Sequence, residues 1–304
     1  MMMITDDEFE AVKTAAVYAA TNTGLVPQAR TSLFRYVSMR GSAWDMLEKT
    51  LLTNTLPLSR SVTLNDPFDS NPVIVNDTIP SDISKFANDL LSIGGKPMNF
   101  DVLKVVHPNG QQMSPAQLQE ATKALLQSMM RTQSQQCHIA SFSRRISSEL
   151  QWSHYAEGYK GLAYHFVTQP EDDSGFRFLR PVRYSSQRPI ILLSEFMDHL
   201  KRVDTGRFPQ EWFSFEQRSF LTKSLAWAYE EEERLVKQNV SEVQFLENEL
   251  VSIILGPRFP DADIDRLRAI TKNRKRPLKI FRAQSSPTSY AIEVEWEHDL
   301  YSGA

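Results

Sequence analysis

Residues 139–166 read IASFSRRISSELQWSHYAEGYKGLAYHF and crowd polar and aromatic side chains into a short span. The alternation that ends at Ser141-Phe142-Ser143 predicts a strand, and the paired serines ahead of Glu149 predict the N-cap of a short helix carrying Trp152-Ser153-His154-Tyr155. A Lys160-Gly161 turn then leads into a second apolar strand. Because binding groups gather at the loops and element ends of a rigid scaffold, we look for function here first.

The composition of the chain is that of an ordinary globular protein. It has 304 residues, of which 41% are hydrophobic and 23% charged, and a formal net charge of −3. That charge gives no global attraction to nucleic acid or to an anionic membrane. The single cysteine, Cys137, excludes an internal disulfide and any Cys-x-x-Cys metal pattern. The start lacks a secretory signal and no apolar run is long enough to cross a bilayer, so we expect a soluble, cytoplasmic protein without membrane contact.

Strands and single helices alternate along the rest of the chain. This pattern predicts an α+β fold in one domain over residues 1–304, with a mixed, mainly antiparallel sheet and flanking helices. Residues 1–30 form a predicted N-terminal helical extension, and 71–114 are interpreted as a variable insertion. The other predicted strands cover 33–37, 55–59, short pieces of 176–184, 250–255, 278–282 and 289–295. The other predicted helices cover 43–52, 81–91, 115–130, 192–203, 209–221 and 261–271.

Four consecutive glutamates, Glu230 to Glu233, form the strongest electrostatic feature of the sequence. Most charge runs are solvated helix faces. Here Trp227 and Tyr229 precede the run and Leu235 follows it, which favours a strand that sends Glu230 and Glu232 to one face. Two neighbouring carboxylates raise each other's proton affinity, so one could hold a substrate hydroxyl while the other positions a nucleophile. The solvated face and the paired carboxylates remain equally open from the pattern alone.

The other candidate residues each have a structural alternative. Ser141 and Ser143 share one face of their predicted strand, where hydroxyls could bind a ligand or only orient a carboxylate. A lone histidine such as His154 is more often structural than catalytic, and no metal-ligand spacing surrounds it. Arg35 could be a core ion-pair partner or a fork for phosphate. The basic loop 272–276 is interpreted as a solvated turn, with nucleic-acid contact as the less favoured reading.

Several motifs together resemble an uncharacterised family of bacterial and phage proteins. The match extends from about residue 33 to 294, but the family carries no assigned activity. The motifs are Phe34-Arg35-Tyr36, Asn65-Asp66-Pro67-Phe68-Asp69, Ser141-Phe142-Ser143, Trp152-Ser153-His154-Tyr155-Ala156 with Lys160-Gly161, Val182-Arg183-Tyr184, Thr222-Lys223-Ser224, Tyr229-Glu230-Glu231-Glu232-Glu233-Arg234 and Ile254-Leu255-Gly256-Pro257.

The order Arg35, Ser141-Phe142-Ser143, Glu230-Glu231-Glu232 also resembles the clostridial-toxin-like mono-ADP-ribosyltransferases. The resemblance implies that NAD is the substrate and that an unknown protein, nucleic acid or small molecule accepts ADP-ribose. It further implies a role as a toxin or defence effector, with a possible neutralising partner. The long spacing from Ser143 to Glu230 and the Trp152 to Gly161 block depart from that signature.

The same resemblance implies a role for each site residue. Arg35 would hold the NAD diphosphate or ribose, and Ser141 would support the nicotinamide ribose and the glutamate. Glu232 would bond the ribose 2′-hydroxyl and stabilise the cationic transition state, which an anion placed beforehand can do. Glu230 would help to activate the acceptor. Phe142 or Tyr155 would flank the nicotinamide, and the NAD-contacting set is completed by Tyr36, Ser143 and His154.

Two other functions fit the sequence. In the first, the protein is a non-catalytic binding module whose polar residues form a buried network that holds the fold. In the second, it is a metal-dependent nuclease that uses Asp66, Asp69 and the glutamates with Mg²⁺. The buried network consists of Arg35, Asp66, Asp69, His154, Tyr155, Glu232 and Arg234.

Overall fold

A computed structural model of the chain describes residues 31–79, 114–169, 174–196, 198 and 218–296. They belong to two compact units. One, called here the sheet unit, comprises residues 25–63, 137–184 and 225–304; the other, the insert unit, comprises 1–24, 64–136 and 185–224. The single domain over 1–304 stays a prediction. The expected helical extension 1–30 and residues 80–113 of the expected insertion 71–114 lie outside the described residues.

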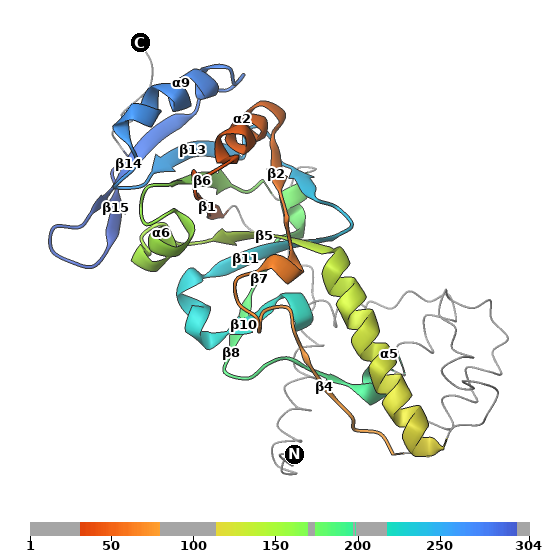
Figure 1. Cartoon of the computed structure of the whole chain (residues 1–304). Coiled ribbons are helices and arrows are strands. Elements are labelled where there is room, and N and C mark those ends of the chain that lie inside the picture. The colour runs from red at the N-terminus through yellow and green to blue at the C-terminus, as the bar shows by residue number, and fades with distance from the viewer. Residues whose placement is uncertain (1–30, 80–113, 170–173, 197, 199–217, 297–304) are drawn as a thin grey trace. The chain divides into compact units, whose positions relative to one another are not determined.

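The sheet unit contains a nine-stranded sheet in the order β15-β14-β13-β6-β1-β5-β11-β7, with β3 paired to β5 (Figure 1). All neighbours on this path are antiparallel except β13 and β14. The predicted mixed, mainly antiparallel sheet is therefore confirmed. Its strands are β1 (Ser32–Val37), β3 (Ser59–Arg60), β5 (Cys137–Ser143), β6 (Leu162–Val167), β7 (Arg180–Pro181), β11 (Glu232–Gln238), β13 (Leu250–Leu255), β14 (Lys279–Ser285) and β15 (Ile292–Val294).

Helices cover the sheet through apolar faces set by their sequence. Helix α2 (Ala43–Thr53) buries Leu47 and Leu51, one turn apart, and α9 (Ile264–Lys272) buries Leu267 and Ile270. Both helices share one apolar core with Leu33 of β1. Helix α6 (Glu149–Tyr155) buries Trp152 in a second core with Phe34 of the same strand. Since consecutive strand residues point to opposite faces, α6 lies on the face opposite α2 and α9.

The register of the strands decides which functional residues share a face. Ser143 of β5 lies opposite Phe34 of β1 and opposite Glu232 of β11, and Ser141 lies opposite Arg234. These residues therefore point to the face covered by α6, called here the α6 face. Phe142 lies opposite Glu233 and points to the other side, the α2 face. The prediction that Ser141 and Ser143 share a face without Phe142 is confirmed.

The strand expected across the four glutamates begins later than predicted. Residues Leu225–Glu230 form a 3₁₀ helix, and β11 starts at Glu232. Between them, Glu231 has a positive φ of 44° and donates its N–H to the Ala228 carbonyl. This turn interrupts the alternation, so the prediction that Glu230 and Glu232 alternate along one strand is wrong. Trp227 and Tyr229 are two residues apart, which is the spacing of a strand, but both lie in the 3₁₀ helix.

The remaining elements are short. In the sheet unit, β2 pairs with β12, and the 3₁₀ helices are Ser61–Thr63, Gly175–Phe178 and Asp261–Asp263. In the insert unit, β4 pairs in parallel with β9. There the Asp66 carboxylate accepts the Phe68 N–H at 2.9 Å, which is the local turn expected for this segment. Their bounds are β2 (Thr55–Pro57), β4 (Val73–Val75), α5 (Pro115–Gln136), β8 (Arg183–Ser185), β9 (Ile190–Leu192), β10 (Thr222–Ser224) and β12 (Glu242–Gln244).

Candidate functional site

An ion pair between Glu232 and Arg234 lies on the α6 face of β11. Arg234 Nε is 2.7 Å from Glu232 Oε1, and Nη2 is 3.1 Å from Oε2. The side chains are only 1% and 4% exposed, which removes both charges from water. Two-point bonding of this kind matches the planar fork of arginine to the carboxylate. Arg234, two residues further along β11, thus holds the Glu232 carboxylate in place and balances most of its charge.

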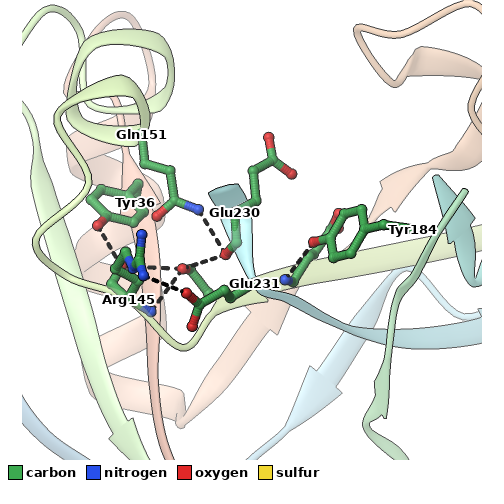
Figure 2. Close-up of polar contacts among 8 residues, drawn as sticks. Tyr36, Arg145, Gln151, Tyr184, Glu230 and Glu231 are labelled. Atoms are coloured by element: carbon green, nitrogen blue, oxygen red, sulfur yellow. Dashed lines mark hydrogen bonds and ion pairs between the residues drawn. The ribbon is translucent and has the colours of Figure 1, made fainter. Parts of the chain in front are cut away.

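Three hydrogen bonds fix the backbone where β5 ends and β11 begins (Figure 2). The Ser143 hydroxyl donates to the Glu230 carbonyl at 2.6 Å and accepts the Arg145 N–H at 2.9 Å. The Gln151 amide donates to the same Glu230 carbonyl at 3.0 Å. Helix α6 therefore reaches across to the end of the 3₁₀ helix, and Ser143 orients a glutamate through its main chain.

The residue between the two site glutamates adopts a strained conformation. A left-handed φ is uncommon for a side chain such as that of Glu231 and costs on the order of 1 kcal/mol or more. Two contacts with the end of β5 hold it there: its carbonyl accepts the Arg144 N–H at 3.1 Å, and its carboxylate pairs with Arg145 at 2.8 Å. The turn directs Glu230 and Glu232 into different surroundings.

The Glu230 carboxylate meets a tyrosine from α6. Tyr155 donates its hydroxyl to Glu230 Oε1 at 2.7 Å, and Glu230 is only 3% exposed. Figure 2 shows this carboxylate directed away from Gln151 and from the Arg145–Glu231 pair. A hydroxyl donor stabilises the ionised form of a carboxylate and fixes its direction. Glu230 is therefore a buried carboxylate whose direction is fixed by Tyr155.

Aromatic side chains lie next to this carboxylate. His154 is exposed, and its ring is 6.4 Å from the ring of Trp227, which in turn is 6.0 Å from the ring of Tyr229. Burial, and then the charge of Glu230, raise the pKa of Tyr229 to about 12, so its hydroxyl stays protonated at neutral pH. The rings give planar or cationic groups a surface to stack on beside an anion.

Two further tyrosines support the same region. Tyr36 of β1 donates its hydroxyl to the Arg145 carbonyl at 2.7 Å and packs edge-on against Trp152 of α6. The Tyr184 hydroxyl accepts the Glu232 backbone N–H at 2.7 Å. Burial raises the pKa of both tyrosines, so neither ionises near neutral pH. Both act here as neutral hydrogen-bonding groups.

Arg35 does not join the other predicted site residues. Its Cα partner on β6 is Tyr164, which places it on the α2 face, and its guanidinium lies 5.8 Å from the centre of the Phe142 ring. Arg35 Nη2 donates to the Pro57 carbonyl at 3.0 Å, and burial lowers its pKa. Arg35 and Phe142 therefore lie on the side of the sheet opposite Ser141 and Glu232, because residues alternate between the two faces along β1 and β5. The expectation that these four residues contact NAD stays a prediction.

The structure thus brings together most of the predicted residues and adds others. Sequence reasoning did not identify Gln151, Arg145 or Tyr184 as members of this network. Gln151 and Arg145 carried no signal, because each depends on how α6 and the end of β5 fold back. Tyr184 stood in a quoted motif without an assigned role. The predicted residues on or beside the α6 face are Tyr36, Ser141, Ser143, His154, Tyr155, Glu230 and Glu232.

Among the residues that the structure describes, no group of three or more His, Cys, Asp or Glu side chains is arranged to hold a metal ion. None of the helices in the described ranges is both long and apolar enough to cross a membrane. Comparisons with family models, curated proteins and solved structures found no match. The functional assignment therefore depends on the geometry of the α6 face.

Proposed function

We propose that the protein is an NAD-dependent, ADP-ribosyltransferase-like enzyme whose site lies on the α6 face. The observation that carries this proposal is the adjacency of three segments far apart in sequence. The Phe34-Arg35-Tyr36, Ser141-Phe142-Ser143 and Glu232 segments occupy neighbouring strands β1, β5 and β11, with the serines opposite Glu232 and Arg234. The order of the same three segments along the chain suggested this class of enzyme.

The proposed reaction breaks the bond between nicotinamide and C1′ of the ribose. The bonding electron pair moves to the nicotinamide ring and neutralises its charge, leaving positive charge on the ribose. The acceptor then attacks C1′ and loses a proton to solvent. A carboxylate oriented before the reaction stabilises that cation without reorganisation. In this proposal, that carboxylate is Glu230 or Glu232.

The contacts divide the roles of these two carboxylates differently from the sequence-based expectation. Arg234 bonds to both oxygens of Glu232, so most of its charge is already balanced. The Tyr155 hydroxyl donates to Glu230 Oε1 and orients this carboxylate from the α6 side. We therefore assign stabilisation of the ribosyl cation to Glu230, with Tyr155 as a positioning residue. Glu232 holds the architecture of the site through Arg234.

The diphosphate also needs a partner other than Arg35. Arg145 lies beside Ser143 at the end of β5, and its side chain is 48% exposed. Its ion pair with Glu231 is partly solvated and therefore weak enough to exchange for a phosphate. Arg145 is our candidate for the NAD diphosphate. The acceptor, a neutralising partner and a toxin or defence role in the cytoplasm are further parts of this proposal.

Chromatographic measurement of nicotinamide released from NAD tests the proposal. The wild-type protein should release nicotinamide, and Tyr155→Phe should slow the release at least tenfold while the melting temperature changes little. Arg145→Gln should raise KM for NAD more than it lowers kcat. If the folded wild-type protein neither binds NAD nor releases nicotinamide, the proposal is wrong.

A second candidate is the non-catalytic binding module with a buried polar network. The specific observation in its favour is the almost complete burial of Glu232 and Arg234, since a buried ion pair can hold a fold together without contacting a ligand. Under this function, Glu232→Ala abolishes folding and Tyr155→Phe has no effect on any reaction of NAD. The nuclease gains no support from the carboxylates, since those of the described residues do not group as metal ligands.

A further inference from the structure

The segment from Lys272 to Arg282 concentrates positive charge at one end of the sheet unit. These eleven residues contain six Lys or Arg and no Asp or Glu, on a chain whose formal net charge is −3. They form the end of α9, the loop after it and the start of β14. A density of like charge this high is unfavourable for the folded protein on its own and favours contact with an anionic partner.

Four of these cations are exposed. Lys272, Lys275, Arg276 and Lys279 are all exposed, and none makes an ion pair within the described ranges. Arg282, by contrast, is paired with Asp261 at 2.6 Å. The four form the group that we call the basic loop surface.

A buried arginine within the loop adds a second, independent observation. Arg274 is 7% exposed, and its Nη2 donates to the Glu247 carbonyl at 2.7 Å. Its Nε and Nη1 atoms are also buried and have no hydrogen-bond partner among the described residues. Burial lowers its pKa, with Glu247 acting in the opposite direction. The loop therefore carries one more cation, incompletely satisfied by the chain.

The neighbouring side chains discriminate between anionic partners. The large apolar residues of the segment, Leu278, Ile280 and Phe281, are buried, and Pro277 alone of its apolar residues is exposed, so the segment presents no large apolar side chain for insertion into a lipid interface. The segment itself exposes no aromatic ring for base stacking with single-stranded nucleic acid, and the nearby Trp296 ring packs against Phe281 and Phe34. A surface of lysine and arginine side chains without aromatic or large apolar groups suits the phosphates of a duplex, which form a regular array of negative charge.

We propose that the basic loop surface binds the phosphate backbone of double-stranded nucleic acid without reading its sequence. The proposal does not depend on the reaction assigned to the α6 face. Binding through four phosphates should weaken steeply with salt, because the logarithm of the association constant falls by about 0.9 per contact for each tenfold rise in salt concentration. Between 50 and 200 mM salt this amounts to roughly a hundredfold loss.

Fluorescence anisotropy with a labelled 20-base-pair DNA duplex and the full chain tests this inference. The triple variant Lys272→Gln/Lys275→Gln/Arg276→Gln should bind at least tenfold more weakly at 50 mM salt and lower the salt slope by about 3. The matched control Arg60→Gln/Lys160→Gln/Arg183→Gln removes the same charge from exposed positions elsewhere and should bind like the wild type.

Each other outcome overturns the proposal. Equal weakening by both triple variants would show that net charge alone governs binding. No binding of duplex at 50 mM salt would show a solvated turn, as the sequence first suggested. Stronger binding to phosphatidylserine vesicles or to single-stranded DNA would assign the surface to those partners instead. Nicotinamide release should be the same in both triple variants, which separates failure here from failure of the proposed reaction.

Discussion

Glu232 and Arg234 form a two-point ion pair that is almost completely buried on the α6 face of β11. The pair is local in sequence, since the residues are two apart and therefore point the same way from the strand. It stands directly opposite Ser143 and Ser141 of β5. The position of the candidate site is thus fixed by a strand pairing between segments about ninety residues apart.

Removing one member of this pair should leave the other charge without its partner in the protein interior. We expect Arg234→Met to destabilise the fold by about 3–5 kcal/mol, because Glu232 would remain buried without its partner. Denaturant unfolding followed by circular dichroism measures the change. The half-exposed pair Arg145–Glu231 supplies the control: Glu231→Gln should cost about 1 kcal/mol or less. Equal costs for both variants would show that burial does not set the energy of the pair.

Arg35 should matter for stability and not for NAD. Its guanidinium bonds to the Pro57 carbonyl on the α2 face, so Arg35→Met should lower the melting temperature by a few degrees. KM for NAD, corrected for the folded fraction, should stay within twofold of the wild-type value. A tenfold rise in KM without loss of folded protein would return Arg35 to the site and contradict the strand register.

His165 should make the fold sensitive to acid. Burial lowers its pKa from 6.5 to about 4, while its ring nitrogens bond to Ser32 and Ser252. Between these pH values the unfolded chain binds a proton that the folded chain does not, so this contribution is present above pH 6.5 and is lost as the pH falls toward 4. Because the ring is partly solvated, we expect about 1–2 kcal/mol.

The measurement for His165 is the free energy of unfolding between pH 7 and pH 4 for wild type and His165→Gln. Carboxylates titrate in the same range in both proteins, so the difference between the two curves isolates the histidine. The wild-type protein should lose more stability than the variant as the pH falls. Parallel curves would mean that the pKa of His165 is the same in the folded and unfolded states, which contradicts this prediction.

Gly161 should tolerate no side chain at the turn between α6 and β6. A Cβ atom there would lie 2.1 Å from the Val37 carbonyl oxygen and 3.0 Å from the backbone of Ala156, neither of which can move cheaply. Gly161→Ala should therefore destabilise the protein by more than about 3 kcal/mol. Gly158, with φ of +60° but open space around it, is the control, and its alanine variant should cost about 1 kcal/mol. A thermal melt that ranks them in the reverse order would place the turn differently.

Local sequence patterns predicted several elements of this fold. Ser148 does cap α6, accepting the Gln151 N–H at 3.4 Å, and alternation did assign Ser141 and Ser143 to one face. Such features depend on neighbours a few residues apart. Alternation along β1 also places Arg35 on the face opposite Phe34 and Tyr36. Whether Arg35 shares a face with Glu232 of β11 depends on the register between distant strands, which alternation alone does not give.

Nonlocal contacts decided the parts that the sequence could not predict. The strained conformation of Glu231 arises from bonds to Arg144 and Arg145, which are over eighty residues away. Nothing in a run of four glutamates indicates that Glu230 ends a 3₁₀ helix and that Glu232 begins a strand. The pairing of Tyr155 with Glu230 likewise requires α6 to fold back over β5.

Nicotinamide release by Glu230→Gln, compared with Glu233→Gln, tests the central claim most directly. The two glutamates are both buried, but Glu233 points to the α2 face, where its carboxylate is paired with Arg144. With rates normalised to folded protein, Glu230→Gln should reduce nicotinamide release at least a hundredfold and Glu233→Gln less than threefold. Equal rates in the two variants, or a greater loss in Glu233→Gln, would contradict a site on the α6 face.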